Sequence, residues 1–308
     1  MTLGMMMSLT YIIGQVAAPV LEFIGFAQTY QDAKISLEKL NDVHSLKDEE
    51  YDIKSKSTEL PSSCNIVFDH VSFSYSGSER DLALKDISLV IPENKVTAIV
   101  GSSGSGKTTL VKLIQGFYLP YSGTLLIGDI PIHKINPHVW RSKTGSVMQD
   151  SYILSDTIAR NIALGDKEVD YDKLRHAVQV ANIENFIKSL PLGFETKISM
   201  EGTDISQGQR QRILIARAVY KNPEFLFIDE ATNALNANNE KCIIDSMKEF
   251  YKGKTVLIAA HRLSTVKDAD NIIVLENGRI IEQGCHEFLL AKHGAYYNLV
   301  KNQLELAK

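Results

Sequence analysis

A glycine- and serine-rich segment, GSSGSGKTT at residues 101–109, follows a short apolar run, VTAIV at residues 96–100. The β-branched residues of the run predict a buried parallel strand, and KTTL at residues 107–110 predicts the start of a helix. Glycines allow a tight turn in which loop and helix N–H groups converge on an anion. Because Lys107 and Thr108 complete the pattern G-x-x-x-x-G-K-[ST], the segment predicts a nucleoside triphosphate site.

The predicted nucleotide contacts come from the whole loop and the first helical turn: Gly101, Ser102, Ser103, Gly104, Ser105, Gly106, Lys107, Thr108 and Thr109. We expect the Lys107 ammonium to reach the β- and γ-phosphates and the Thr108 hydroxyl to ligate Mg²⁺. A flexible Gly/Ser loop without a ligand is the alternative. The complete match, in a strand–loop–helix context, disfavours it.

A second candidate is the acidic pair that follows the apolar run FLFI, at Asp229 and Glu230. Open α/β sheets bind ligands at the carboxyl ends of their strands, and Asp229 stands at such an end. Its carboxylate suits Mg²⁺, and Glu230 is the candidate base or polariser for an attacking water. Two solvated acids at the end of a strand are the alternative.

The N-terminal segment Met1–Leu21 contains no charged residue. As a helix it is about 32 Å long, close to the hydrocarbon core of about 30 Å. We predict a transmembrane helix that continues into an amphipathic extension to residue 46; a buried helix of a soluble domain is the alternative. Since one span makes no pathway, we interpret it as the last span of a membrane domain whose remainder lies outside this sequence.

Residues 47–63 are charged and serine-rich and predict a linker, followed by an α/β domain at residues 64–308. Apolar patterns predict strands of a mixed sheet at residues 65–75, 84–91, 96–100, 125–127, 145–148, 225–228, 255–259, 271–276 and 279–282. Helical patterns predominate between residues 155 and 190, and we expect an inserted helical subdomain at about residues 150–215. A second helix is predicted at residues 206–220, with Ser206 as its N-cap.

Composition excludes several classes of protein. The net charge of -4 favours no polyanionic partner, so we expect no nucleic-acid binding. The chain has 3 cysteines at isolated positions, which argues against a disulfide framework and against a zinc site.

From about Ile66 to its end, the chain resembles the nucleotide-binding domain of ABC transporters, specifically of exporters. The resemblance is carried by an ordered set: Tyr75, the phosphate loop, Gln149, SQGQRQR at residues 206–212, FLFIDE at 225–230 and His261 within AAHRLST. It implies the ABC ATPase variant of the P-loop NTPase fold, a mixed sheet core with an inserted helical subdomain. It also implies ATP as substrate with Mg²⁺.

The resemblance assigns further roles. It implies that Tyr75 stacks on adenine, although a core tyrosine on a strand is the alternative. Gln149 resembles the glutamine that senses Mg²⁺ and the attacking water, and His261 resembles the histidine that bonds the γ-phosphate. The implied catalytic set is Glu230, His261 and Gln149, and the implied metal set is Thr108, Gln149 and Asp229.

In the family, the Ser206 segment caps the nucleotide held by the other subunit of a head-to-tail dimer. The resemblance therefore implies that Ser206, Gly208 and Gln209 contact ATP across a dimer interface. Two residues depart from the family pattern: Gln207 replaces a glycine, and Asn236 replaces an aspartate. Neither departure touches Lys107, Asp229, Glu230 or His261, so we expect an active ATPase.

The expected function is ATP hydrolysis that powers export across the bacterial inner membrane, with the nucleotide-binding domain in the cytoplasm. Expected partners are a second nucleotide-binding domain, in a homodimer or paired half-transporter, a transmembrane domain and membrane lipid. A looser resemblance, in the segments at residues 202–212 and 294–306, points to peptidase-containing exporters of bacteriocin-type double-glycine peptides. The alternatives are a soluble ABC-type or other P-loop ATPase outside transport, an importer subunit, and a regulatory half that binds ATP without turnover.

Overall fold

The computed structural model describes residues 2–45, 52–148, 150–199, 205–229, 237–260 and 266–306. The chain divides into two compact units, Met1–Ser55 and Lys56–Lys308.

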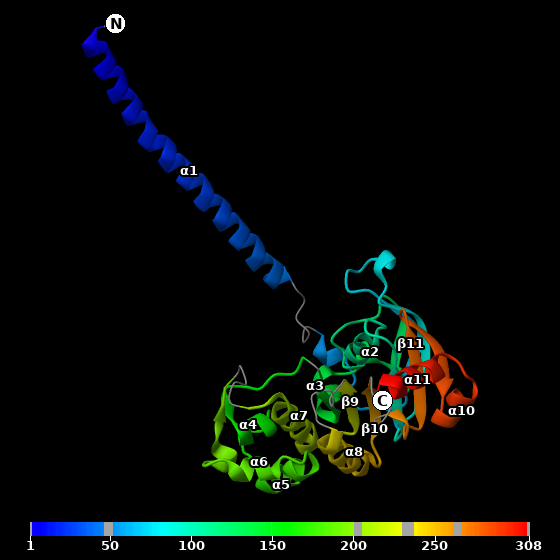
Figure 1. Cartoon of the computed structure of the whole chain (residues 1–308). Helices are drawn as coiled ribbons and strands as arrows, with labels where there is room; N and C mark the ends of the chain where they lie inside the picture. Colours follow the sequence, from blue (N-terminus) through cyan, green and yellow to red (C-terminus); the bar gives the residue numbers. More distant parts are fainter. Residues whose placement is uncertain are drawn as a thin grey trace. The chain divides into compact units, whose positions relative to one another are not determined.

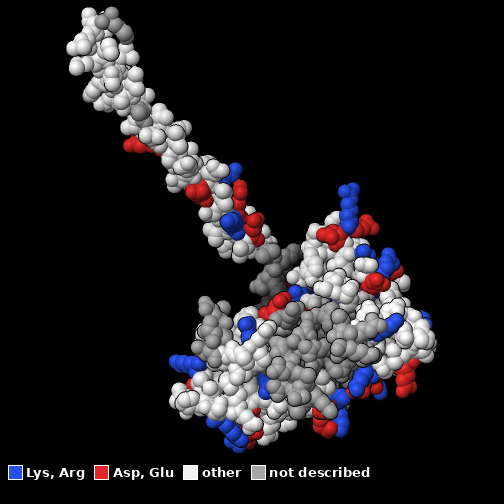
Figure 2. Space-filling view, viewed as in Figure 1, with Lys and Arg blue, Asp and Glu red and all other residues white. Residues whose placement is uncertain are grey.

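The first unit consists mainly of one helix, α1 (Leu3–Ser45), with a short 3-10 turn at Ile53–Ser55. The predicted span and its amphipathic continuation thus form a single helix of 43 residues. Large apolar side chains along it are exposed, including Ile13 at 63% and Phe23 at 71%. Figure 2 shows that charged side chains gather on the half of α1 that ends at Ser45. By length and composition, α1 is the one helix in the described ranges that is apolar enough to cross a membrane.

The second unit is built on a six-stranded sheet with the strand order β12-β11-β3-β10-β9-β6. Its neighbours pair in parallel, except for the antiparallel hairpin β11–β12. The strands are β3 (Val96–Val100), β6 (Thr144–Val147), β9 (Phe225–Asp229), β10 (Thr255–Ala259), β11 (Asn271–Glu276) and β12 (Arg279–Gly284). The predicted runs at 225–228, 255–259 and 271–276 are confirmed as strands of this sheet, and β9 extends by one residue to include Asp229.

A separate antiparallel sheet has the order β2-β1-β4-β5, formed by β1 (Ile66–Phe73), β2 (Leu84–Ile91), β4 (Ser122–Ile127) and β5 (Ile130–Pro131). The sequence pattern had indicated one mixed sheet, and it could not show that these strands pair among themselves. The first strand is irregular, with register shifts around Val71, next to His70 with its φ of 50°. The strand ends at Phe73, so Tyr75 lies beyond it.

Helices cover the sheets and form a cluster, α4 to α7, to one side of the second unit (Figure 1). Their bounds are α2 (Lys107–Ile114), α3 (Pro137–Lys143), α4 (Ile158–Ile162), α5 (Tyr171–Val180), α6 (Glu184–Ser189), α7 (Gln207–Lys221), α8 (Ala237–Tyr251), α10 (His286–Ala291) and α11 (Ala295–Leu306). The short strands β7 (Asp156–Thr157) and β8 (Lys197–Ile198) pair within the helical segment.

The six-stranded sheet separates two hydrophobic cores. Along β3, Ala98 and Val100 join the core that includes α4, α5 and α7, whereas Ile99 faces the core formed with α2 and the antiparallel sheet. A parallel strand buried on both faces needs apolar residues at successive positions, which explains the uninterrupted runs in the sequence. The helical segment therefore shares its core with one face of the sheet.

Trp140 of α3 joins the end of α2 to the sheet. Its indole N–H donates to the Ile114 carbonyl oxygen at 2.8 Å, and its ring centroid lies 4.9 Å from that of Phe225. The side chain is 2% exposed. It therefore fixes the helix that begins at the phosphate loop.

We expect Trp140→Phe to lower the free energy of unfolding by about 1–3 kcal/mol, because it removes a buried hydrogen bond and leaves a cavity. Calorimetric unfolding of the full chain in detergent measures this change. The control is Tyr152→Phe at a residue that is 58% exposed, where a change below about 0.5 kcal/mol is expected. Equal effects of the two substitutions would contradict the role given to Trp140.

Candidate functional site

The phosphate loop, residues 101–106, connects β3 to α2, as predicted. Lys107 is the first residue of α2 and is 5% exposed. Its ammonium donates to the carbonyl oxygens of Gly101 at 2.9 Å and Ser102 at 3.0 Å. The lysine side chain is thus folded back over the loop, which places its charge where the loop amides converge.

Two glycines of the loop are required by close neighbours. A Cβ on Gly101 would lie 2.1 Å from the Leu275 carbonyl oxygen, and one on Gly106 would lie 2.7 Å from Leu84 Cδ2. Gly106 also has a φ of 108°, in the region that favours glycine. The hairpin β11–β12 further supports the loop, because the Gly278 N–H donates to the Ser105 carbonyl oxygen at 3.1 Å.

The loop has polar groups suited to an anion. Gly106 is the N-cap of α2, and no side chain caps this end in the described part of the chain. The Ser105 hydroxyl is buried and has no hydrogen-bond partner among the described residues. A helix N-terminus with unused donors is a favourable place for a phosphate group.

Strand register places Asp229 on the same edge of the sheet as this loop. Asp229 pairs with Ala259 of β10, and Ala259 pairs with Ile99 of β3. Two strand spacings separate the backbones of Asp229 and Ile99 by about 10 Å. The Asp229 side chain is 1% exposed. A buried carboxylate and a buried ammonium therefore belong to one sheet edge, which is the arrangement that a phosphate–metal pair needs.

The three residues predicted for catalysis, Gln149, Glu230 and His261, lie outside the described residues, as does Asn236. The strands that precede the three, β6, β9 and β10, are neighbours in the sheet, and their described ends are Val147, Asp229 and Ala259.

Tyr75 is 54% exposed, so it is not a core tyrosine. Its hydroxyl lies 3.1 Å from the Thr109 hydroxyl, in the first turn of α2. The structure thus brings Tyr75 to the phosphate-loop helix across 34 residues of sequence. An exposed aromatic ring at this place can stack on a planar base.

Ser206 is the N-cap of α7, as predicted, and Gln209 completes a capping box. The Ser206 hydroxyl accepts from the Gln209 N–H at 3.2 Å, and the Gln209 side chain accepts from the Ser206 N–H at 2.8 Å. The prediction from the sequence included the Ser206 cap but not the bond from the Ser206 N–H to the Gln209 side chain, although S-x-x-Q is the signature of a capping box. Both residues thus bond each other, and Gln207 is exposed.

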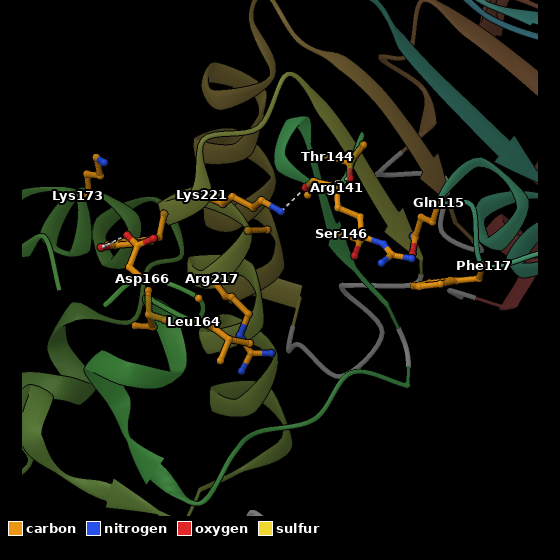
Figure 3. A pocket seen from close by; sticks show the side chains of 15 residues that line it. Gln115, Phe117, Arg141, Thr144, Ser146, Leu164, Asp166, Lys173, Arg217 and Lys221 are labelled. Atoms are coloured by element: carbon orange, nitrogen blue, oxygen red, sulfur yellow. Dashed lines mark hydrogen bonds between the residues drawn. The ribbon is translucent and has the colours of Figure 1, made fainter. Parts of the chain in front are cut away.

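A cavity of about 570 Å³ lies beside β6, between α7, α4 and the end of α2. Figure 3 shows its two walls, lined by Gln115, Arg141, Ser146, Leu164, Asp166 and Arg217. Burial lowers the pKa of both Arg217 and Lys221. No sequence pattern marks this cavity, because its lining comes from five separate segments.

The cavity is linked to the chain around Gln149. The Gln115 amide donates to the Met148 sulfur at 3.1 Å, and Arg210 of α7 donates to the Ser151 carbonyl oxygen at 3.1 Å. Arg217 of α7 also donates to the carbonyl oxygen of Asn161, in α4, at 2.8 Å. The phosphate-loop helix and the Ser206 helix therefore both contact the segment that contains Gln149.

The parallel sheet, the loop and the buried acid define an ATPase domain of the P-loop class. Residues 84–233 match the family described as "ABC transporter". The chain therefore contains the ATP-binding domain of an ABC transporter, of the kind found in exporters. This confirms the fold predicted from the sequence motifs, and with it the assignment to the ABC transporter ATPase family.

Similar proteins support this assignment. The chain is 41% identical over 306 residues to the toxin RTX-I translocation ATP-binding protein of Actinobacillus pleuropneumoniae, covering 99% of the chain and 43% of the relative. It is 40% identical over 298 residues to the alpha-hemolysin translocation ATP-binding protein HlyB of Escherichia coli, covering 97% and 42%. The chain thus spans less than half the length of these relatives.

Among solved structures, the chain is similar to a bacterial Atm1-family ABC exporter with ATP bound. The TM-score is 0.81 at 34% sequence identity, and the match covers 89% of this chain and 47% of the other.

We expect Gly101→Ala to weaken ATP binding roughly tenfold or more, because the new methyl group displaces the loop from the Leu275 carbonyl. Calorimetric titration of the full chain with Mg-ATP measures the affinity. The control is Gly253→Ala, at a glycine with a φ of +72° and no atom within 4 Å of a new Cβ. That substitution strains the backbone without a clash, so ATP affinity should not change.

Proposed function

We propose that this chain is the ATP-hydrolysing part of an exporter that moves a polypeptide across the bacterial inner membrane. The observation that carries the proposal is the shared sheet edge of the phosphate loop and Asp229, set by the pairing of β3, β10 and β9. The ATP-binding domain would lie in the cytoplasm, and α1 would cross the bilayer.

In this proposal the triphosphate lies along the N-terminus of α2. The loop amides and the Lys107 ammonium bind its oxygens, and Tyr75 stacks on the adenine. The Thr108 hydroxyl and the carboxylate of Asp229, with Gln149, would hold Mg²⁺, which supplies positive charge to the phosphate groups. The buried carboxylate of Asp229 and the uncapped helix end fit this pair of ions.

Hydrolysis would depend on Glu230, which accepts the proton of an attacking water or orients it. Gln149 would position that water, and His261 would donate to the γ-phosphate. Each of the three follows the end of a neighbouring strand within two residues of sequence. This placement supports a common site, because the carboxyl ends of parallel strands meet at one edge.

A second copy of the domain would complete the site. Ser206, Gly208 and Gln209 at the start of α7 would approach the nucleotide of the partner, with the helix N-terminus facing the phosphates. The capping box has a consequence here, because the Ser206 hydroxyl already accepts from Gln209 and keeps its own O–H to donate. The residues Gln207 and Asn236 would alter contacts at this interface without removing the acids.

The cavity beside β6 supports contact with a transmembrane domain. It is open, it carries arginine and lysine side chains, and it adjoins the segment around Gln149 through Met148. A cytoplasmic loop of the membrane domain seated there would press on the residues next to the catalytic edge.

The proposed cargo is a polypeptide. Relatives at about 40% identity are named for the translocation of toxins, and the looser resemblance to exporters of double-glycine peptides indicates the same chemical class. Peptides of the bacteriocin type are the narrower proposal, and a peptidase domain would belong to the part of such a protein outside this sequence.

Two substitutions separate binding from turnover. We expect Lys107→Ala to abolish tight ATP binding, because it removes the cation of the loop, and Glu230→Gln to retain binding while lowering turnover on the order of 10³-fold. Phosphate release and nucleotide titration on the full chain in lipid measure the two quantities.

A matched control is Glu249→Gln, at an exposed acid of α8 that forms an ion pair with Lys252; it should leave both quantities unchanged. Hydrolysis by Glu230→Gln at the parental rate would refute the role of Glu230. An unmodified chain that binds ATP without releasing phosphate would favour the regulatory alternative.

The membrane assignment of α1 is tested separately. The full chain should stay in the membrane pellet after carbonate extraction, and Ile13→Asp combined with Val20→Asp should release it, because a charge within the apolar run costs up to about 3 kcal/mol, most at the bilayer centre. Leu40→Asp, in the charged half of α1, is the control and should stay in the pellet. A parental chain that is recovered in the supernatant would contradict a span at α1.

A further inference from the structure

The ring of Tyr75 lies outside any strand, and its orientation needs a physical cause. β1 ends at Phe73, and Tyr75 is 54% exposed. An exposed aromatic side chain samples several rotamers, and binding that fixes one of them loses affinity to the entropy of ordering. A base-stacking residue therefore benefits from contacts that hold its ring before the nucleotide arrives.

Tyr118, in the loop between α2 and β4, supplies such a contact. Its ring centroid lies 5.3 Å from that of Tyr75 with an interplanar angle of 87°, and Phe73 lies 4.9 Å from Tyr75 at 82°. Tyr118 and Phe73 also contact each other at 5.4 Å. Perpendicular ring pairs at these distances are favourable and directional. The three rings form one cluster, of which only Phe73 is buried.

The loop that carries Tyr118 is itself fixed at both ends. At its start, Gly116 has a φ of 77°, and the Phe117 N–H donates to the Lys112 carbonyl oxygen at 3.2 Å, which closes α2 with a Schellman motif. At its end, the Tyr121 N–H donates to the Ser72 carbonyl oxygen at 2.8 Å. The loop that carries Tyr118 is therefore bonded to α2 at one end and to β1, the strand that precedes Tyr75, at the other.

The hydroxyl of Tyr75 adds a third restraint, through its 3.1 Å contact with the Thr109 hydroxyl. The ring is thus held at its edge by neighbouring rings and at its tip by the first turn of α2. These contacts leave more than half of the residue accessible.

We propose that Tyr118 is a positioning residue for nucleotide binding: its ring holds the ring of Tyr75 in the orientation that stacks on a base. Tyr118 thereby sets the preference of the site for ATP over a polyphosphate that has no base. The inference rests on the proposed function of Tyr75.

The test compares the affinities of Mg-ATP and Mg-tripolyphosphate for the full chain in lipid, by calorimetric titration. Tyr118→Ala should weaken ATP binding roughly three- to ten-fold and leave tripolyphosphate binding unchanged. Tyr118→Phe should restore the parental ratio of the two affinities, because it keeps the ring. Tyr118→Leu, which keeps apolar volume without a ring, should behave as Tyr118→Ala and serves if the alanine variant does not fold.

The matched control is Tyr121→Ala in the same loop, at a tyrosine that is 50% exposed and has no ring contact within the described part of the chain. It should not change the ratio. Equal losses of ATP and tripolyphosphate affinity in Tyr118→Ala would overturn the inference, since they indicate general damage.

Tyr75→Ala tests the stacking role of Tyr75 separately from the positioning role of Tyr118. If it leaves the ratio unchanged, the proposed role of Tyr75 is wrong. If it lowers the ratio of ATP affinity to tripolyphosphate affinity, and Tyr118→Ala and Tyr118→Leu do not, then Tyr75 stacks on the base without Tyr118. The inference about Tyr118 is then wrong.

Discussion

The parallel pairing of β3 with β10, and of β10 with β9, is the constraint on which the site depends. It aligns Ile99, Ala259 and Asp229 at one level, so the phosphate loop leaves the sheet beside a buried carboxylate. A shift of two residues in either pairing would move Asp229 by about 7 Å along the strand. The register is held because both faces of these strands are buried, in different cores, and a one-residue slip would exchange the faces.

The order of motifs in the sequence predicted the ABC ATPase fold, because each motif has a fixed place in a strand–loop–helix unit. Local patterns also located Ser206 at a helix start. They could not separate the strands into two sheets, since alternation says which face of a strand is apolar and does not say which strand is its neighbour.

Contacts between distant segments were the other part that the sequence could not predict. Tyr75 was singled out from a family pattern, and its position beside Thr109 depends on the bend after Phe73. Tyr118 had no motif to mark it. The same holds for the bonds from Arg210 and Arg217 to the segment after Met148, because long side chains reach across helices in ways that spacing does not specify.

Arg210 and Arg217 bond α7 to the chain that follows β6, in addition to the packing of α7 against the sheet. Asn161 is fully buried, and its side chain bonds the Leu154 backbone and accepts from Arg217. The described residues on either side of Gln149 thus bond two helices: Met148 accepts from Gln115 at the end of α2, and Ser151 accepts from Arg210 of α7. The N-termini of these two helices bear the phosphate loop and the Ser206 segment.

The buried indole under α2 has an optical consequence. Trp140 is the only tryptophan in the sequence. Tryptophan emission, excited selectively over the tyrosines, therefore originates at a single junction, between the far end of α2 and β9. The protein thus contains its own fluorophore at that junction, and a shift in tryptophan emission during an ATP cycle would report a change in the surroundings of the indole.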